Sequence, residues 1–188
     1  VIMFDFDGVI ADSLDAFYDV FRRLCGELGY HRVTSKEDIL KLLEDNFLVG
    51  LLKARFPFYR LPRLRREFGP RMAAANTHVT PYDGICPVVS ELAQRHPVYV
   101  VTTNTARTAA LFLDRHGVRG VRAIIGADRI ASKVKKIRRV VRMHPDCTPY
   151  YIGDTMGDIR EARRARAVPI AVGWGWHSRA KLSEARPE

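Results

Sequence analysis

The sequence predicts an α/β fold: a Rossmann-like parallel β-sheet core flanked by helices, with a small all-helical cap inserted after the first strand. Short, unbroken apolar runs at residues 1–4, 98–101 and 150–152 predict strands that are buried on both faces, as in parallel sheets. Helical patterns alternate with such runs after residue 80, whereas residues 14–80 carry helical patterns only. This order of elements indicates one parallel sheet with a helical insertion.

Length and charge limit the classes of protein. The chain has 188 residues, which is enough for one core with a small insertion. No apolar run approaches the ~20 residues that a membrane span requires, so we expect no membrane contact. The formal net charge is +10, but the basic residues are spread over several predicted helices, without a recognisable nucleic-acid-binding motif. We therefore do not expect nucleic-acid binding, and the charge is better explained by solvation or by attraction of phosphorylated metabolites.

The cysteines indicate a reducing compartment. Cys25, Cys86 and Cys147 are widely spaced, odd in number, and form no CxxC pair. This spacing argues against a disulfide framework and against a zinc site. We expect a cytoplasmic location, while the sequence leaves the oligomeric state open.

Two aspartates follow the first predicted strand. Asp5 and Asp7 are separated by one aromatic residue and precede Gly8. Residues two apart on a strand point the same way, and ligands bind at the carboxyl edge of an open parallel sheet. A single acid there would be explained as a turn or cap residue. Two close carboxylates repel each other unless a cation or a shared proton intervenes, so the pair predicts a metal-assisted acid site.

Residues 14–80 are predicted to form a helical cap. The helices expected from the spacing of apolar residues cover residues 14–28, 35–51 and 62–72. Asp12 or Ser13 is the expected cap of the first helix, and a capping-box-like sequence begins the second at Ser35. These apolar stripes are most simply the core positions of a small helical unit.

Helices and strands alternate after a turn-rich break at residues 80–84. The expected strands are residues 98–101, 121–125, 150–152 and 169–173. Helices are expected over residues 85–95, before Gly117, from Lys133 to the residue before Pro145 with Ser132 as its cap, and around Ile159.

Polar residues gather where these elements meet one edge of the predicted sheet. They are Asp5 and Asp7, then Thr102, Thr103 and Asn104, then Asp154 and Asp158, and Lys133 at a helix start. Each has an ordinary structural explanation, such as β-propensity for Thr102 or a helix-start acid for Asp158. Together they place acids, hydroxyls and one cation on the edge where parallel sheets bind ligands.

In these motifs the sequence resembles the haloacid dehalogenase superfamily of phosphohydrolases. Residues 5–9 match its first motif, Thr102 its second, Lys133 its third and residues 153–158 its fourth, GDxxxD. The likeness covers nearly the whole chain in the right order. Residues 11–13 and 173–178, read together, resemble the phosphoglycolate-phosphatase-like branch. The resemblance implies that residues 1–13 and 81–188 form the core domain and that residues 14–80 form the cap domain.

The resemblance also implies a chemistry that uses Mg²⁺. A phosphate monoester and an attacking carboxylate are both anions, and a hard divalent cation offsets their repulsion. Asp5 would be the nucleophile that forms an aspartyl-phosphate, and Asp7 the acid and then the base. The implied Mg²⁺ ligands are Asp5, Asp7 through its backbone carbonyl, Asp154, and Asp158, which would bind the ion directly or hold a coordinated water. The implied phosphoryl-binding residues are Thr102, Thr103, Asn104 and Lys133, of which Thr102 and Lys133 would also be catalytic.

The function implied is therefore a Mg²⁺-dependent phosphatase of a small phosphorylated metabolite, with phosphoglycolate as a candidate. One alternative is a phosphomutase of the β-phosphoglucomutase type, which would return the phosphoryl group to the substrate. Another is a basic binding or scaffold protein with little turnover, because fold and motif do not guarantee activity.

Overall fold

The computed structural model describes residues 1–44, 47–127 and 132–188. The strands are β1 (Ile2–Phe4), β2 (Val98–Val101), β3 (Ala123–Ile125), β4 (Tyr150–Gly153) and β5 (Val168–Ala171). The helices are α1 (Leu14–Glu27), α2 (Lys36–Leu42), α3 (Phe47–Lys53), α4 (Leu61–Ala75), α5 (Ile85–Arg95), α6 (Ala106–Arg115), α7 (Lys133–Met143), α8 (Met156–Arg164) and α9 (Arg179–Glu184), with a 3₁₀ turn, η1 (Phe58–Arg60). Of the helices in the described part of the chain, all are too short or too polar to cross a membrane.

The five strands found in the described residues form one parallel sheet in the order β3-β2-β1-β4-β5. Strand β1 lies at the centre, where Ile2 pairs with Val98 of β2 on one side and with Tyr150 of β4 on the other. From β1 the chain first adds β2 and β3 on one side and then β4 and β5 on the other, so the direction of strand addition reverses next to β1. Ligand sites of open parallel sheets lie at such reversals, outside the carboxyl ends of the strands.

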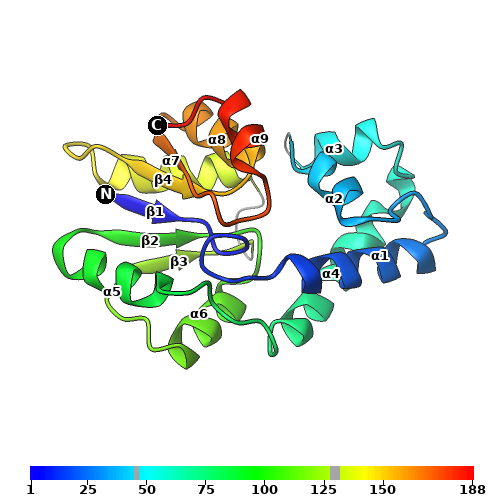
Figure 1. Ribbon diagram of the computed structural model, residues 1–188, viewed down its shortest axis with the longest axis horizontal. Coiled ribbons are helices and arrows are strands. Elements are labelled where there is room, and N and C mark those ends of the chain that lie inside the picture. The colour runs from blue at the N-terminus through cyan, green and yellow to red at the C-terminus, as the bar shows by residue number, and fades with distance from the viewer. Residues whose placement is uncertain (45–46, 128–131) are drawn as a thin grey trace.

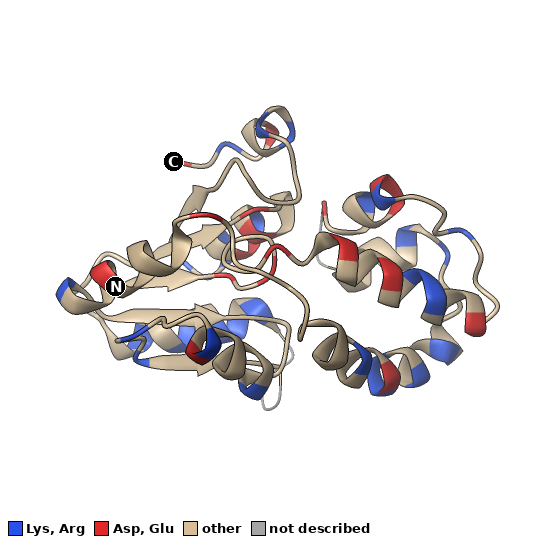
Figure 2. Cartoon of the chain, turned by 60° about the horizontal axis from the view of Figure 1, so that its bottom comes forward, with Lys and Arg blue, Asp and Glu red and all other residues tan. Residues whose placement is uncertain are grey.

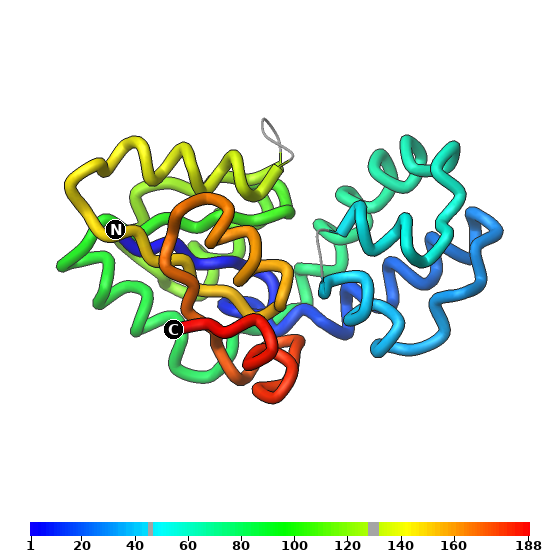
Figure 3. Tube along the Cα trace, turned by 90° about the horizontal axis from the view of Figure 1, so that it is seen from above, coloured from blue at the N-terminus to red at the C-terminus, as the bar shows by residue number. Residues whose placement is uncertain are grey.

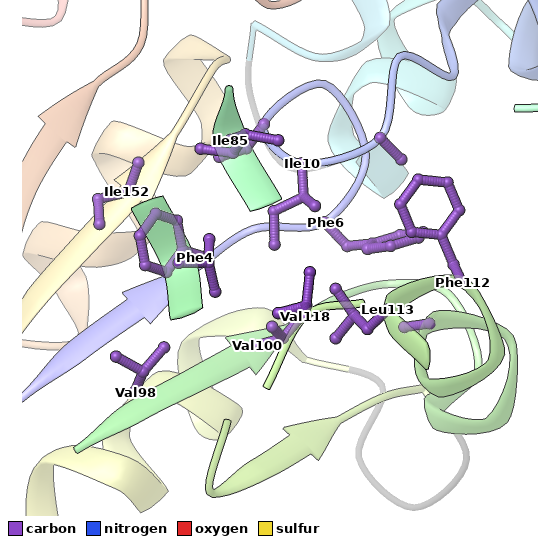
Figure 4. Packing of buried hydrophobic residues seen from close by; sticks show 14 of the residues in the cluster. Phe4, Phe6, Ile10, Ile85, Val98, Val100, Phe112, Leu113, Val118 and Ile152 are labelled. Carbon is purple, nitrogen blue, oxygen red and sulfur yellow. The ribbon is translucent and has the colours of Figure 1, made fainter. Parts of the chain in front are cut away.

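Helices cover both faces of the sheet, because successive side chains of a buried strand point to opposite faces. Phe4 and Val100 pack on one face with residues of α5 and α6, in the cluster drawn in Figure 4. Met3 and Tyr99 pack on the other face with residues of α7 and α8. Figure 3 shows α5 and α7 on opposite sides of the sheet. The predicted fold class, a Rossmann-like sheet flanked by helices, is confirmed.

Helices α1 to α4 form a separate group beside the sheet, at the right of Figure 1. We call residues 14–80 the helical module. Its interior is a cluster of aromatic and aliphatic side chains, in which Phe17 contacts Phe21, Phe47 and Phe68. The two connections between module and sheet run side by side, since Asp12 N–H donates to the carbonyl of Thr80 at 2.9 Å.

Some predicted elements differ from the observed ones. The single helix predicted over residues 35–51 is wrong, because α2 ends at Leu42 and α3 begins at Phe47. Helix α3 packs so closely on α2 that a Cβ on Gly50 would lie 2.1 Å from the Leu42 carbonyl oxygen. Only glycine permits that approach. Helix α9, which Ser178 caps, was not predicted.

Candidate active site

Asp5 stands directly after β1 and extends its pairing, because its N–H donates to the Ile152 carbonyl of β4 at 2.8 Å. The side chain is 7% exposed. Its Oδ1 accepts from the N–H of Phe6 at 2.8 Å, and its Oδ2 lies 2.6 Å from Lys133 Nζ. After Asp5 the chain turns sharply at Gly8, whose φ is +78°. The nucleophile predicted from the sequence is thus buried, fixed in orientation and paired with a cation.

Lys133 joins two of the carboxylates. It is the first residue of α7, which Ser132 caps by accepting from the N–H of Lys135, as predicted. Lys133 Nζ lies 2.6 Å from Asp5 Oδ2 and 2.6 Å from Asp158 Oδ1. Burial opposes its charge, but Asp158 and Asp5 outweigh burial and raise the pKa of Lys133 well above its ordinary value. The ammonium is therefore a permanent positive charge in the site.

Asp158 is held on both of its oxygens. While Lys133 takes Oδ1, Oδ2 accepts from the N–H of Thr155 at 3.1 Å and from its hydroxyl at 2.6 Å. Thr155 in turn caps the N–H of Asp158, which completes a capping box at the start of α8. Burial alone would raise the pKa of Asp158, but Lys133 and Thr155 hold it below its ordinary value. Asp158 is thus a stable carboxylate whose hydrogen-bonding capacity is largely used.

Asp154 occupies a space that glycines keep open. Its Oδ2 accepts from the N–H of Trp176 at 2.8 Å. A Cβ on Gly8 would lie 2.0 Å from that oxygen, and a Cβ on Gly175 would lie 2.3 Å from the Asp154 Cβ. Burial, together with Asp158 and Asp5, raises the pKa of Asp154 well above its ordinary value. In contrast to Asp158, Asp154 forms no ion pair with a lysine or arginine in the described part of the chain, and the more distant Lys133 offsets its burial only in part.

The acid cluster fits a divalent cation. Asp5, Asp154 and Asp158 each offer a carboxylate oxygen within 4.8 Å of the others, and all three residues are buried. Burial raises the pKa of Asp5 to about 8, even though Lys133 opposes the shift. Three buried carboxylates around one lysine are electrostatically unfavourable unless protons or a cation intervene. Hard oxygen donors of this kind suit Mg²⁺ or Ca²⁺.

Asp7 has different surroundings. It is half-buried, and its carboxylate accepts from the Ser13 hydroxyl at 2.8 Å and from Asn104 Nδ2 at 3.4 Å. Burial raises the pKa of Asp7, and these two hydrogen bonds oppose the shift. Asp12 or Ser13 was predicted as the cap of the first helix. Ser13 occupies the N-cap position, but its hydroxyl makes no cap hydrogen bond and donates to Asp7 instead. A carboxyl group held in this way is suited to exchange a proton with a ligand.

The polar residues after β2 divide by exposure. Thr102 is fully buried, its hydroxyl accepts from the Asn104 N–H at 2.9 Å, and its carbonyl accepts from Lys136 Nζ at 2.5 Å. Thr103 is exposed, whereas Asn104 is buried with its amide against Asp7. Of the two neighbouring hydroxyl residues, Thr103 is therefore the one open to a ligand.

Three residues at this edge were not predicted as part of the site: Lys136, Thr155 and Trp176. Thr155 carried a signal, because Thr-x-x-Asp before a helix is a capping-box pattern. Lys136 carried none, since a lysine in a basic helix is usually solvated. Trp176 lies in a segment whose position beside Asp154 depends on the complete fold.

The comparisons with known proteins agree with one another. A family model described as haloacid dehalogenase-like hydrolase matches residues 2–172. The chain is 24% identical over 195 residues to a phosphoglycolate phosphatase of Synechococcus elongatus, covering 100% of this chain and 90% of that protein. Among solved structures, a haloacid dehalogenase-like hydrolase of Streptococcus pneumoniae superposes with a TM-score of 0.79 at 22% identity, over 100% of this chain and 90% of that one. A hydrolase from Pseudomonas syringae gives a TM-score of 0.82 at 15% identity, over 99% and 90% of the two chains.

Proposed function

Because this chain belongs to the family of haloacid dehalogenase-like hydrolases, we propose that it hydrolyses a small phosphorylated metabolite through an aspartyl-phosphate on Asp5. The observation that carries the proposal is the contrast between two carboxylates at the end of β1. Asp5 is fixed beside Lys133 in the acid cluster, while Asp7 is held by Ser13 and Asn104 outside that cluster. Carboxylates in such different environments suit different roles in one reaction.

The first step transfers the phosphoryl group. A carboxylate oxygen of Asp5 attacks phosphorus, and the bond from phosphorus to the leaving oxygen breaks as the new bond forms. The leaving oxygen takes the electron pair of that bond and a proton from Asp7, so it departs as a neutral hydroxyl group of the product. Lys133 remains charged beside Asp5, where it stabilises the developing negative charge on the phosphoryl oxygens.

The second step releases phosphate. Asp7, now deprotonated, accepts a proton from a water molecule, whose oxygen attacks phosphorus. The bond between phosphorus and the Asp5 oxygen breaks, and its electron pair returns to the Asp5 carboxylate. Both aspartates are then restored to their starting forms.

The carboxylates of Asp5 and Asp154 and the backbone carbonyl of Asp7 are proposed to hold Mg²⁺, with Asp158 orienting this set. When bound, the ion offsets the repulsion between the carboxylate and the phosphate ester. At ~4 Å and an effective dielectric near 20, this repulsion is about 4 kcal/mol for each pair of unit charges, or about a thousandfold in rate. The glycines around Asp154 support this role, because without side chains at Gly8 and Gly175 the backbone packs closely on Asp154 and fixes its position.

The phosphoryl-binding residues are proposed to be Lys133 and the backbone and side chains of residues 102–104. The burial of Thr102 supports a modification of the sequence-based assignment: Thr103 offers the hydroxyl, and Thr102 supports the turn that presents it. Lys136 would act with Thr102, whose carbonyl accepts from its ammonium.

Phosphoglycolate is the first candidate substrate, because the relative from Synechococcus elongatus is a phosphoglycolate phosphatase. The net charge of +10 favours anionic metabolites in general. We also propose a cytoplasmic location, which the free cysteines Cys25, Cys86 and Cys147 support.

The test is a turnover assay with 2-phosphoglycolate, other phosphorylated metabolites and p-nitrophenyl phosphate, each with and without Mg²⁺. Release of phosphate that requires Mg²⁺ is the expected result, and Asp5→Asn is the control. Isomerisation of a hexose 1-phosphate without net release of phosphate would instead identify a phosphomutase. Absence of both reactions over a broad panel would contradict the proposal and favour a binding protein.

A further inference from the structure

The end of helix α2 meets the beginning of helix α8 across the boundary between the module and the core. The first N–H groups of a helix and its last carbonyl groups have no partners within the helix. Here they are paired with each other: the Gly157 N–H of α8 donates to the carbonyl of Leu43, the C-cap of α2, at 3.1 Å. The positive end of one helix dipole thus faces the negative end of the other.

His177 makes the second connection between the same two helix ends. Its Nδ1 accepts from the N–H of Met156, the first residue of α8, at 3.0 Å. Its Nε2 lies 3.0 Å from the carbonyl oxygen of Leu40 in α2. Since Nδ1 is the acceptor, Nε2 carries the proton and donates it to that carbonyl. His177 is buried, with 3% of the residue exposed, so one neutral imidazole links the two helix ends.

Two basic side chains of the core hold the next residue of the module. Arg160 donates to the Glu44 carbonyl at 2.6 Å. Lys181 lies 3.2 Å from the Glu44 carboxylate, where both side chains are about one-third exposed. The ion pair is partly solvated and contributes little by itself. Residues 40–44 are therefore held to the core chiefly by hydrogen bonds to three backbone carbonyls.

The same contacts lead directly to the acid cluster. Asp158 follows Gly157 in the first turn of α8, and the carbonyl of Asp154 accepts from the N–H of His177 at 3.2 Å. The neighbouring Trp176 donates its N–H to Asp154 and packs its ring against Phe17 of α1, with ring centroids 5.0 Å apart. One dipeptide, Trp176-His177, thus contacts the module with its side chains and Asp154 with its backbone.

We propose that His177 is a positioning residue that couples docking of residues 40–44 to the placement of Asp154 and Asp158. Undocking leaves two donors without their partners. The Gly157 N–H loses the Leu43 carbonyl, and the Nε2–H of His177 loses the Leu40 carbonyl. The docked form therefore holds α8 and the two acids in the arrangement described above. For catalysis, this inference rests on the proposed phosphatase function, whereas the docking contacts themselves do not.

Amide hydrogen exchange tests the docking without any substrate. The full chain with Mg²⁺ is compared with His177→Leu, with His177→Gln, which keeps a donor and an acceptor, and with His144→Leu. The last is a matched control, because the His144 ring nitrogen contacts the Tyr99 hydroxyl at 2.9 Å and lies outside the docking contacts. We expect exchange at Gly157 and residues 36–43 to be about tenfold faster in His177→Leu, and close to wild type in the other two.

Unchanged exchange at Gly157 in His177→Leu would overturn the proposal. Equal acceleration in His144→Leu would also overturn it, because the effect would then be general destabilisation. If His177→Leu lacks a cooperative unfolding transition, Arg160→Met provides the same measurement with a substitution at the edge of the contact. Faster exchange there would support docking, and unchanged exchange would overturn it.

Kinetics then test the coupling, with 2-phosphoglycolate and p-nitrophenyl phosphate as the probes. His177→Leu should lower kcat/KM about tenfold, mainly through KM, because substrate binding must then also drive the docking. His177→Gln should recover most of this loss. An unchanged kcat/KM in His177→Leu, although exchange at Gly157 is faster, would overturn the positioning role. If wild-type protein releases no phosphate from any ester, the proposed function fails, while the exchange result on docking stands.

Discussion

The sheet edge and the helical module differ in what they bury. The sheet edge buries charged groups, with Asp5, Lys133, Asp154 and Asp158 each at most 9% exposed. The module buries aromatic and aliphatic side chains, and its charged residues lie mainly on its surface. Figure 2 shows acidic segments between the sheet and the module, and Lys and Arg distributed over the helices of both parts.

This difference indicates that the sheet edge is built for binding or reaction and that the interior of the module is built for packing. Burying charge costs free energy that packing does not recover, so a fold retains a buried acid cluster where the cluster binds or reacts. The module follows ordinary helical packing, and its substitutions should act on stability and on substrate preference. Predictions for the two regions should therefore differ in kind: rate and metal affinity at the sheet edge, and unfolding free energy in the module.

The largest expected effect is on rate. Asp5→Asn is nearly isosteric but removes the nucleophile, so phosphatase activity should fall at least about a thousandfold while the thermal unfolding transition persists. Asp12→Asn, the same change at an exposed aspartate of the adjacent connection, should keep nearly full activity. Retention of more than about a tenth of the rate by Asp5→Asn would contradict the assignment of Asp5.

Core substitutions in the module should lower stability, whereas Asp5→Asn lowers the rate. Phe21 is fully buried and contacts Phe17, Phe47 and Phe68, so Phe21→Ala should lower the unfolding free energy by about 3–5 kcal/mol. Phe58, which is 43% exposed, is the control. Phe58→Ala should change the unfolding free energy by less than about 0.5 kcal/mol. Urea unfolding measures both. A comparable loss in the two variants would show that the module lacks the packed interior described here.

Substitution of the two acids of the β4–α8 turn should change the melting temperature in opposite directions. Folding raises the pKa of Asp154, so the metal-free folded protein favours its neutral form, whereas Lys133 and Thr155 favour the charged form of Asp158. Without metal, Asp154→Asn should therefore raise the melting temperature and Asp158→Asn should lower it. In Mg²⁺ titrations, Asp158→Asn should lose about tenfold in affinity and Asp154→Asn more than about a hundredfold. Equal titrations would eliminate the distinction between the two roles.

A further expected effect concerns pH. Burial raises the pKa of Asp5 from 3.8 to about 8, so between these values the metal-free folded protein retains a proton that the unfolded chain has released. Its unfolding free energy should therefore fall as pH rises through this window. Mg²⁺ competes with that proton, so it should raise the melting temperature more at about pH 8 than at about pH 5. An equal gain at both pH values would contradict the shift.

The sequence predicted the fold and the location of Asp5, Asp154 and Asp158 at one edge of the sheet, because both depend on local patterns. Buried parallel strands form continuous apolar runs, and acids directly after such strands share one edge of the sheet. The match to haloacid dehalogenase-like hydrolases over residues 2–172 confirms the family inferred from these motifs. Ser35 and Ser132 also cap their helices as their sequences predict.

What the sequence did not predict depends on contacts between distant residues. The apolar spacing continues across the end of α2, so it gave no sign that α3 folds back with Gly50 against Leu42. Thr102 and Thr103 are adjacent and chemically identical, and only the path of the chain after β2 makes one buried and the other exposed. His177 contacts Leu40, 137 residues earlier, and its sequence neighbours do not indicate this.

Chemical trapping of the covalent intermediate tests the central claim most directly. Borohydride reduces an acyl-phosphate to an alcohol, so a trapped aspartyl-phosphate appears as homoserine in peptide mass spectra. During turnover with Mg²⁺ and an ester that the protein hydrolyses, we expect homoserine at position 5. It should be absent without substrate, and Asp5→Asn should yield none. Turnover without homoserine at position 5, or with homoserine at another aspartate, would contradict the account.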